Sequence, residues 1–159
     1  MKESTRGLTG VVPIIPTPFT EDEEIDEQGI CNCIDFAIDG GIEAVCLPAY
    51  ASEFYKLTDE EKLQVVKVAV NHAAGRIQIV AQSNNPSLRG AIKLAQENVK
   101  AGADVVSLAV PRIFSLPDDS LKEYLGGFLS SIPDTPVLIQ DFNPGGASIS
   151  ADFIQDLME

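Results

Sequence analysis

Short apolar segments rich in β-branched residues alternate along the chain with longer segments of helical spacing. In the longer segments apolar residues recur at steps of three and four, which is typical of helices that bury one face. The expected strands are residues 11–15, 44–48, 77–81, 105–110 and 137–140, and the expected helices are centred on 30–38, 63–73, 88–99, 121–129 and 151–159. The strand–helix unit repeats about every 30 residues, as consecutive βα units do.

Residues suited to helix ends support these boundaries. Thr58 and Glu61 have the spacing of a capping box, in which each side chain accepts a hydrogen bond from a free N–H group of the first turn. The other expected end residues are Asn85 and Ser150 as N-caps, Pro86 in a first turn, and Gly40 and Gly102 with positive φ at helix C-termini.

Strands that are apolar throughout and separated by helices indicate a parallel sheet covered by helices. An open doubly wound sheet and part of a closed barrel both fit this order. Dinucleotide-binding open sheets carry a glycine-rich turn after the first strand. This chain has residues 16–19, Pro-Thr-Pro-Phe, at that place, which favours the barrel.

The composition excludes several classes of function. A net charge of −13 is unfavourable for binding nucleic-acid phosphates or anionic membranes. No apolar run approaches the roughly 20 residues of a membrane helix, and the first six residues do not resemble a signal peptide. We therefore expect a cytoplasmic protein with no nucleic-acid or membrane partner.

A metal site is not expected from these residues. His72 is the only histidine, and it falls in the C-terminal part of an expected helix. Cys31, Cys33 and Cys46 lack the spacing of a disulfide framework or a metal site and are expected to be reduced, buried thiols. The acidic residues 21–24 are expected to form a solvated loop.

Several segments, in order, resemble the dihydrodipicolinate synthase / N-acetylneuraminate lyase family. They are residues 13–19 (Pro-Ile-Ile-Pro-Thr-Pro-Phe), 40–44 (Gly-Gly-Ile-Glu-Ala), 52–53 (Ser-Glu), 57–61 (Leu-Thr-Asp-Glu-Glu), 101–106 (Ala-Gly-Ala-Asp-Val-Val) and 136–139 (Pro-Val-Leu-Ile). The resemblance implies an α/β fold of the (βα)8 TIM-barrel type. Residues 1–159 would then form a single N-terminal portion with about five βα units, and the C-terminal units would lie outside it.

The same resemblance implies chemistry and assembly. Family members join a lysine on strand six to a 2-keto acid, most often pyruvate, as a Schiff base, and need no cofactor. They are usually homo-oligomers. Strand six would lie beyond residue 159, and the seven lysines of this chain fall in the N-terminal tail, a loop or expected helices. We therefore expect these residues in isolation to be inactive.

Three further positions differ from the family pattern. The carboxylate-binding loop Gly-Thr-Thr-Gly-Glu aligns with residues 49–53, so Ala49, Tyr50, Ala51 and Ser52 are expected to bind substrate without the two threonine hydroxyls. The proton-relay tyrosine aligns with Gln140, which forms hydrogen bonds but does not transfer protons at neutral pH. The tyrosine that a neighbouring subunit commonly supplies falls near residues 112–114.

Site residues are expected where strand C-termini enter the following loops. Gln140 and Tyr50 are the expected catalytic side chains, although Tyr50 could instead pack beside Phe54. Arg112 either clamps a substrate carboxylate or pairs with surface acids. Asp141 either replaces the proton relay or caps the next turn. The remaining rim residues are Thr17, Ser52, Gln82, Ser83, Asn84 and Asn143, and Glu53 is expected to brace the loop.

Two classes of function remain open. The first is a lyase or aldolase that makes or breaks a bond of a 2-keto acid. The second is an inactive, barrel-derived module for ligand binding or assembly, which the lost threonines and tyrosines favour. Five βα units leave sheet edges exposed, and such edges pair readily with other chains.

Overall fold

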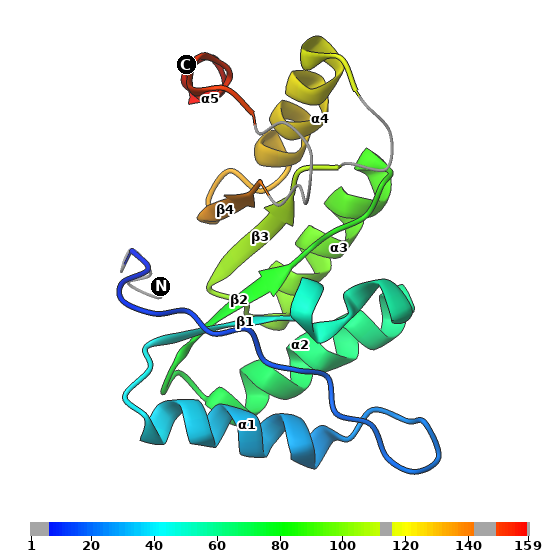
Figure 1. Cartoon of the computed structure of the whole chain (residues 1–159), viewed down its shortest axis with the longest axis vertical. Coiled ribbons are helices and arrows are strands. Elements are labelled where there is room, and N and C mark those ends of the chain that lie inside the picture. The colour runs from blue at the N-terminus through cyan, green and yellow to red at the C-terminus, as the bar shows by residue number, and fades with distance from the viewer. Residues whose placement is uncertain (1–6, 112–115, 142–148, 159) are drawn as a thin grey trace.

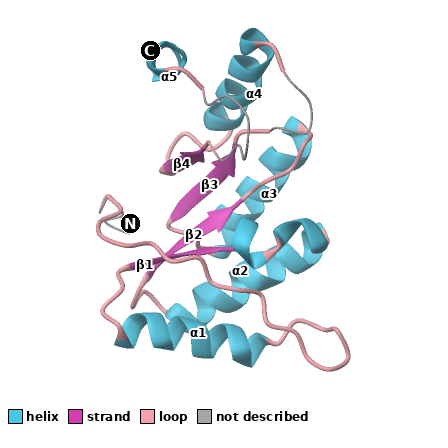
Figure 2. Ribbon diagram, viewed as in Figure 1, coloured by secondary structure: helices cyan, strands magenta, loops and turns pink. Residues whose placement is uncertain are grey.

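The computed structural model describes residues 7–111, 116–141 and 149–158. Within these ranges a parallel sheet has the order β1-β2-β3-β4, formed by Ala44–Leu47, Gln78–Gln82, Val105–Ala109 and Val137–Gln140. The helices are α1 (Glu27–Asp39), α2 (Asp59–Ala73), α3 (Leu88–Ala101), α4 (Asp118–Ser130) and α5 (Ala151–Met158). Helices α2, α3 and α4 lie along one face of the sheet, and the N-terminal segment crosses the other face (Figures 1 and 2).

The predicted first strand, residues 11–15, is wrong as a regular strand. Ile14 forms a single parallel bridge with Cys46 of β1. The Ile15 N–H donates to the Cys46 carbonyl over 3.0 Å, and the Cys46 N–H donates to the Pro13 carbonyl over 2.9 Å. Pro13 and Pro16 have no N–H to continue a ladder on either side. The segment therefore extends the sheet beyond β1 in the direction a barrel requires, with one bridge only.

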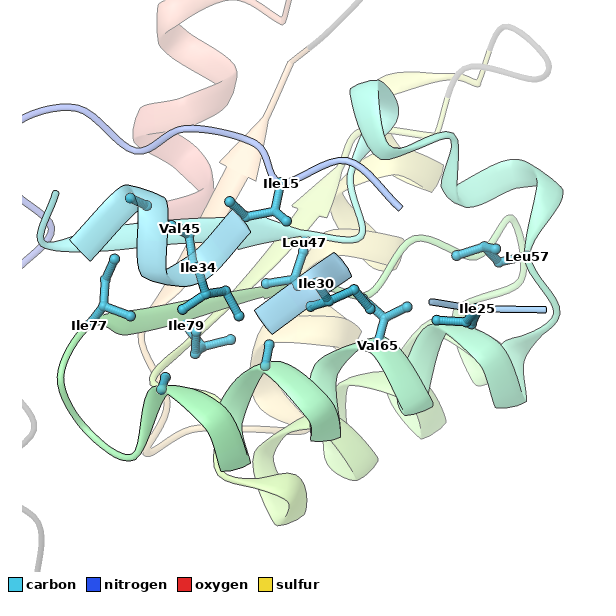
Figure 3. Close-up of a cluster of buried hydrophobic side chains, with 13 residues drawn as sticks. Ile15, Ile25, Ile30, Ile34, Val45, Leu47, Leu57, Val65, Ile77 and Ile79 are labelled. Carbon is cyan, nitrogen blue, oxygen red and sulfur yellow. The ribbon is translucent and has the colours of Figure 1, made fainter. Parts of the chain in front are cut away.

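The hydrophobic core has two sides because side chains alternate across each strand. Val45, Leu47 and Ile79 point towards the helices and pack with residues of α1 and α2, among them Ile30, Ile34 and Val65 (Figure 3). A second cluster on the same side joins β3 to α4 through residues such as Val106, Leu108, Leu125 and Phe128. On the inner face, Ala44, Cys46, Val80 and Val105 pack with Leu8 and Val12.

The prediction that all three cysteines are buried holds for Cys46 alone, since Cys31 and Cys33 are only half-buried. Cys46 is buried, and this burial raises the pKa of its thiol to about 11. The thiol therefore stays protonated at neutral pH and packs as a small apolar group.

His72 lies near the C-terminal end of α2, away from the carboxyl ends of the strands. Its Nε2 is 2.9 Å from Asp35 Oδ1, and Arg76 Nη1 is 3.0 Å from the same oxygen. This cluster joins α1 to α2, and the hydrogen bond from His72 contributes most to lowering the pKa of Asp35.

Some predicted helix ends are confirmed and three are wrong. Pro86 precedes the N-cap Ser87 and therefore lies outside the first turn of α3. Ser150 Oγ accepts from the Phe153 N–H over 3.1 Å, and Gly102 has a φ of +102°. Asn85 is not the cap of α3. Its Oδ1 accepts from the Ser87 N–H over 2.9 Å, and Ser87 Oγ then accepts from Gly90 over 3.1 Å. The positive φ after α1 belongs to the next residue along, Gly41 at +75°, while Gly40 stays at −75°.

The capping box at the start of α2 is confirmed, and we expect Thr58→Ala to lower the free energy of unfolding by about 1 kcal/mol. Thr58 Oγ1 accepts from the Glu61 N–H over 3.2 Å, and Glu61 Oε2 accepts from the Thr58 N–H over 2.7 Å. Chemical denaturation of the native protein measures the loss. Thr58→Ser keeps the hydroxyl and is the matched control, so an equal loss in both variants would contradict the capping role.

The Glu61 half of the box is expected to depend on pH. The hydrogen bond from the Thr58 backbone lowers the pKa of Glu61. A carboxylate with a lowered pKa stabilises the folded state above its ordinary pKa, and this contribution disappears as pH falls through the lowered value. The stability difference between wild type and Glu61→Gln should therefore be constant near neutrality and shrink in acid. A difference that grows in acid would contradict this assignment.

Candidate functional site

Polar side chains gather at the carboxyl ends of the strands, within an otherwise apolar sheet. Gln82 ends β2 and Ser83 follows it, Ser107 lies on β3, and Ser52 follows β1; all four are buried. Burying such groups is unfavourable unless they are hydrogen-bonded. This end of the sheet is also where barrels of this kind carry their sites.

The loop after β1 is fixed by the side chain of Ser52. Its Oγ donates to the Ile15 carbonyl and accepts from the Ala49 N–H over 2.9 Å. Thr17 Oγ1 donates to the Ser52 carbonyl over 2.9 Å. Ser52, predicted to bind substrate, therefore connects the loop to the N-terminal segment in this structure. Its contact with substrate stays a prediction.

The other residues of this loop have different environments. Ala49 is buried, Ala51 is exposed, and Tyr50 makes an edge contact with Phe54 at 5.1 Å between ring centroids. The packing role that the sequence left open for Tyr50 is therefore present, and its catalytic role stays a prediction. Glu53 accepts from Lys56 over 2.8 Å in an exposed pair three residues apart, and its role in bracing the loop stays a prediction.

Tyr50 also lines a cavity of about 400 Å³ between the loops that follow β1, β2 and β3. Lys62 of α2 lines the cavity. Its ammonium nitrogen is 2.9 Å from Asp59 Oδ1 and 5.8 Å from the centre of the Phe54 ring. Asn84 lies on the opposite strand end, where its Oδ1 accepts from the Ala109 N–H over 2.7 Å. The cavity therefore combines a cation and an amide with aromatic walls.

Gln140 at the end of β4 contacts Gln82 at the end of β2. Gln82 Nε2 donates to Gln140 Oε1 over 2.8 Å. The next residue, Asp141, accepts from the Ile149 N–H over 2.8 Å. This bond spans eight residues, unlike the cap of a turn, so the turn-capping role and the proton-relay role of Asp141 both stay predictions. Arg112, residues 113–114 and Asn143 lie outside the described residues, so the predicted carboxylate clamp has no structural account here.

Two polar contacts at the strand ends were not predicted from the sequence. One is the Gln82–Gln140 pair. The other joins Asn98 of α3, which is completely buried, to Ser83: Asn98 Nδ2 donates to Ser83 Oγ over 3.0 Å. Asn98 follows Leu94 and Ala95 on the apolar face of its helix, and an amide at such a position signals a buried partner. A glutamine that ends a strand of apolar residues is the corresponding signal for Gln82.

Tyr124 of α4 supports the loop after β2 from the helix side. Its hydroxyl donates to the Asn85 carbonyl over 2.6 Å, and burial raises the pKa of Tyr124 to about 12.

In the described ranges, no group of three His, Cys, Asp or Glu side chains is placed to hold a metal ion. None of the described helices is long and apolar enough to cross a membrane.

Parallel strands, each followed by a helix, with polar residues at their carboxyl ends, place the chain among the (βα)8-barrel proteins. The chain belongs to the dihydrodipicolinate synthetase family, whose model matches residues 7–159.

Relatives and solved structures agree with this assignment. The chain is 32% identical over 142 residues to 4-hydroxy-tetrahydrodipicolinate synthase of Bartonella quintana, covering 89% of this chain and 47% of that protein. It is 27% identical over 154 residues to L-2-keto-3-deoxyarabonate dehydratase of Azospirillum brasilense, covering 95% and 50%. The crystal structure of dihydrodipicolinate synthase from Aquifex aeolicus superposes with a TM-score of 0.86 at 29% identity, covering 92% and 50%. The chain spans about half the length of the curated relatives it matches.

Proposed function

We propose that the native protein containing this chain is a lyase that makes or breaks a carbon–carbon or carbon–oxygen bond of a 2-keto acid. The observation that carries the proposal is the family match over residues 7–159. The relatives named above are a synthase and a dehydratase. The buried polar residues at the strand ends support a site on the same edge of the sheet.

The proposed chemistry proceeds through a Schiff base. A lysine amine, expected beyond residue 159, attacks the keto carbon of pyruvate or a related 2-keto acid, and water leaves as the imine forms. When the neighbouring bond breaks, its electron pair passes into the protonated imine and gives an enamine; when a bond forms, the enamine supplies that pair to the new bond. Residues of this chain would bind and orient the keto acid: the loop 49–52 through its backbone N–H groups, and Gln140 through its amide.

An inactive module for ligand binding or assembly is the second candidate. The observation that favours it is the loss of a carboxylate-binding hydroxyl and of the proton-relay tyrosine at two positions that align with the family pattern. Ala51 stands where the family pattern has a threonine, and Gln140 stands where it has the tyrosine. An active protein would therefore need another proton route, and Asp141 is the acid next to Gln140 in the chain.

Product analysis of the native protein distinguishes the two candidates. We would incubate it with pyruvate and short aldehydes, and separately with 2-keto-3-deoxy sugar acids, and follow both mixtures by NMR. A lyase is expected to yield a condensation product in the first mixture or a dehydrated or cleaved product in the second. Unchanged substrates in both would reject the lyase proposal in favour of the inactive module.

A further inference from the structure

The Gln82–Gln140 hydrogen bond reaches across a strand that lies between the two residues. In the sheet, Gln82 pairs with Ser107 of β3, and Ala109 of the same strand pairs with Gln140. Paired residues, and residues two apart on one strand, share a face of the sheet. Because Ser107 and Ala109 have short side chains, the two glutamines meet above β3 on the inner face.

The two amides differ in their surroundings. Gln82 is 1% exposed, and its Oε1 has no hydrogen-bond partner among the described residues. Gln140 is only half-buried and ends the last strand of the sheet. A buried amide with an unpaired oxygen costs about 1–3 kcal/mol, and an apolar residue of the same length would avoid that cost. Gln82 therefore has a poor rationale as a packing residue.

We propose that Gln82 is a positioning residue that fixes the amide of Gln140 so that its NH2 group serves as a hydrogen-bond donor to a 2-keto acid. Gln82 Nε2 donates to Gln140 Oε1. Gln140 Nε2 is therefore the atom of this amide that is left to bind a ligand. Its partner is an oxygen of the keto acid, which accepts hydrogen bonds. This inference rests on the proposed function for the class of ligand.

The chemistry of the pair also sets a limit on what it does. Both side chains are neutral amides, which neither gain nor lose a proton near neutral pH. The pair binds and orients an oxygen without transferring a proton. Its contribution to binding is therefore independent of pH between about 6 and 9, unlike that of a tyrosine or an acid at the same place.

A double-mutant cycle on the native protein tests the inference, with pyruvate as the probe and calorimetry as the measurement of Kd. Gln82→Met keeps the length of the side chain and removes its amide. Loss of one neutral hydrogen bond in the site corresponds to about a tenfold rise in Kd. We expect about that rise for Gln82→Met and for Gln140→Ala. Because Gln82 acts through Gln140, the double variant is expected to bind no more weakly than Gln140→Ala alone.

Gln82→Asn is the second variant, since it keeps the amide but is one methylene too short to reach Gln140. It is expected to have the same Kd for pyruvate as Gln82→Met. For each of the two variants, the ratio of its Kd to that of wild type should not change between pH 6 and 9. Additive effects in the cycle, or wild-type affinity in both Gln82 variants, would overturn the inference. Thermal denaturation of each variant shows whether it is folded. If one of the two Gln82 variants is unfolded, the other is used in the double-mutant cycle.

Trapping with borohydride in the same samples separates this inference from the proposed function. An imine in wild type with additive Kd effects overturns the role of Gln82 alone. Coupled Kd effects without an imine overturn the Schiff-base function and leave the positioning role supported. A wild type that neither binds pyruvate nor forms an imine overturns both.

Discussion

Phe128→Ala is expected to lower the free energy of unfolding by about 3–5 kcal/mol, a large fraction of the stability of an ordinary domain. Phe128 is completely buried in the cluster that joins α4 to β3. Its removal loses the transfer free energy of the ring and leaves a cavity that surrounding residues fill only in part. Chemical denaturation of the native protein measures the change.

Phe128→Leu is the matched control because it keeps most of the apolar volume at the same place. We expect this variant to lose less than about 1.5 kcal/mol. If the alanine variant lost as little as the leucine variant, the packing of α4 against the sheet would not be a principal source of stability, contrary to the described core.

Ser52→Ala is expected to lower the free energy of unfolding by about 2–4 kcal/mol and to weaken binding of a 2-keto acid. The hydroxyl hydrogen-bonds to the Ile15 carbonyl and the Ala49 N–H. Alanine would leave both buried groups without that partner, and each unpaired group costs about 1–3 kcal/mol. Since these bonds set the course of the loop 49–52, pyruvate affinity is expected to fall together with stability.

Ser120→Ala on α4 is the control for Ser52→Ala, because Ser120 is exposed. Denaturation and calorimetric titration with pyruvate are the measurements, and the control is expected to stay within about 0.5 kcal/mol of wild type. Unchanged stability in Ser52→Ala would show that water or a relaxed loop replaces the lost bonds.

Much of the fold follows from local pattern. Runs of apolar residues predict the strands that begin at 105 and 137, and apolar residues at helical spacing predict the helices at 30–38 and 121–129. These patterns exist because the apolar side chains of each element face a shared core. The first predicted strand failed because proline removes the N–H groups that a ladder needs, although the apolar pattern at 11–15 was strong. Asn85 failed as a cap because its side chain bonded two residues ahead and moved the helix start to Leu88.

The site was less predictable because its contacts join residues distant in sequence. Gln82 and Gln140 are separated by 58 positions, and only the sheet order shows that two short residues on β3 allow them to meet. Ser52 lies in the loop five residues beyond the end of β1, and its bonds to Ile15 and Ala49 depend on how the N-terminal segment packs. The family resemblance located Ser52 and Gln140, but not Gln82, and it did not show which atoms each side chain engages.

Borohydride trapping with pyruvate, followed by peptide mapping of the native protein, tests the central claim most directly. Borohydride reduces an imine to a stable amine, so the modified lysine can be located in the sequence. We expect a single pyruvate adduct on a lysine outside residues 1–159. An adduct on one of the seven lysines within these residues, or no adduct at all, would contradict it.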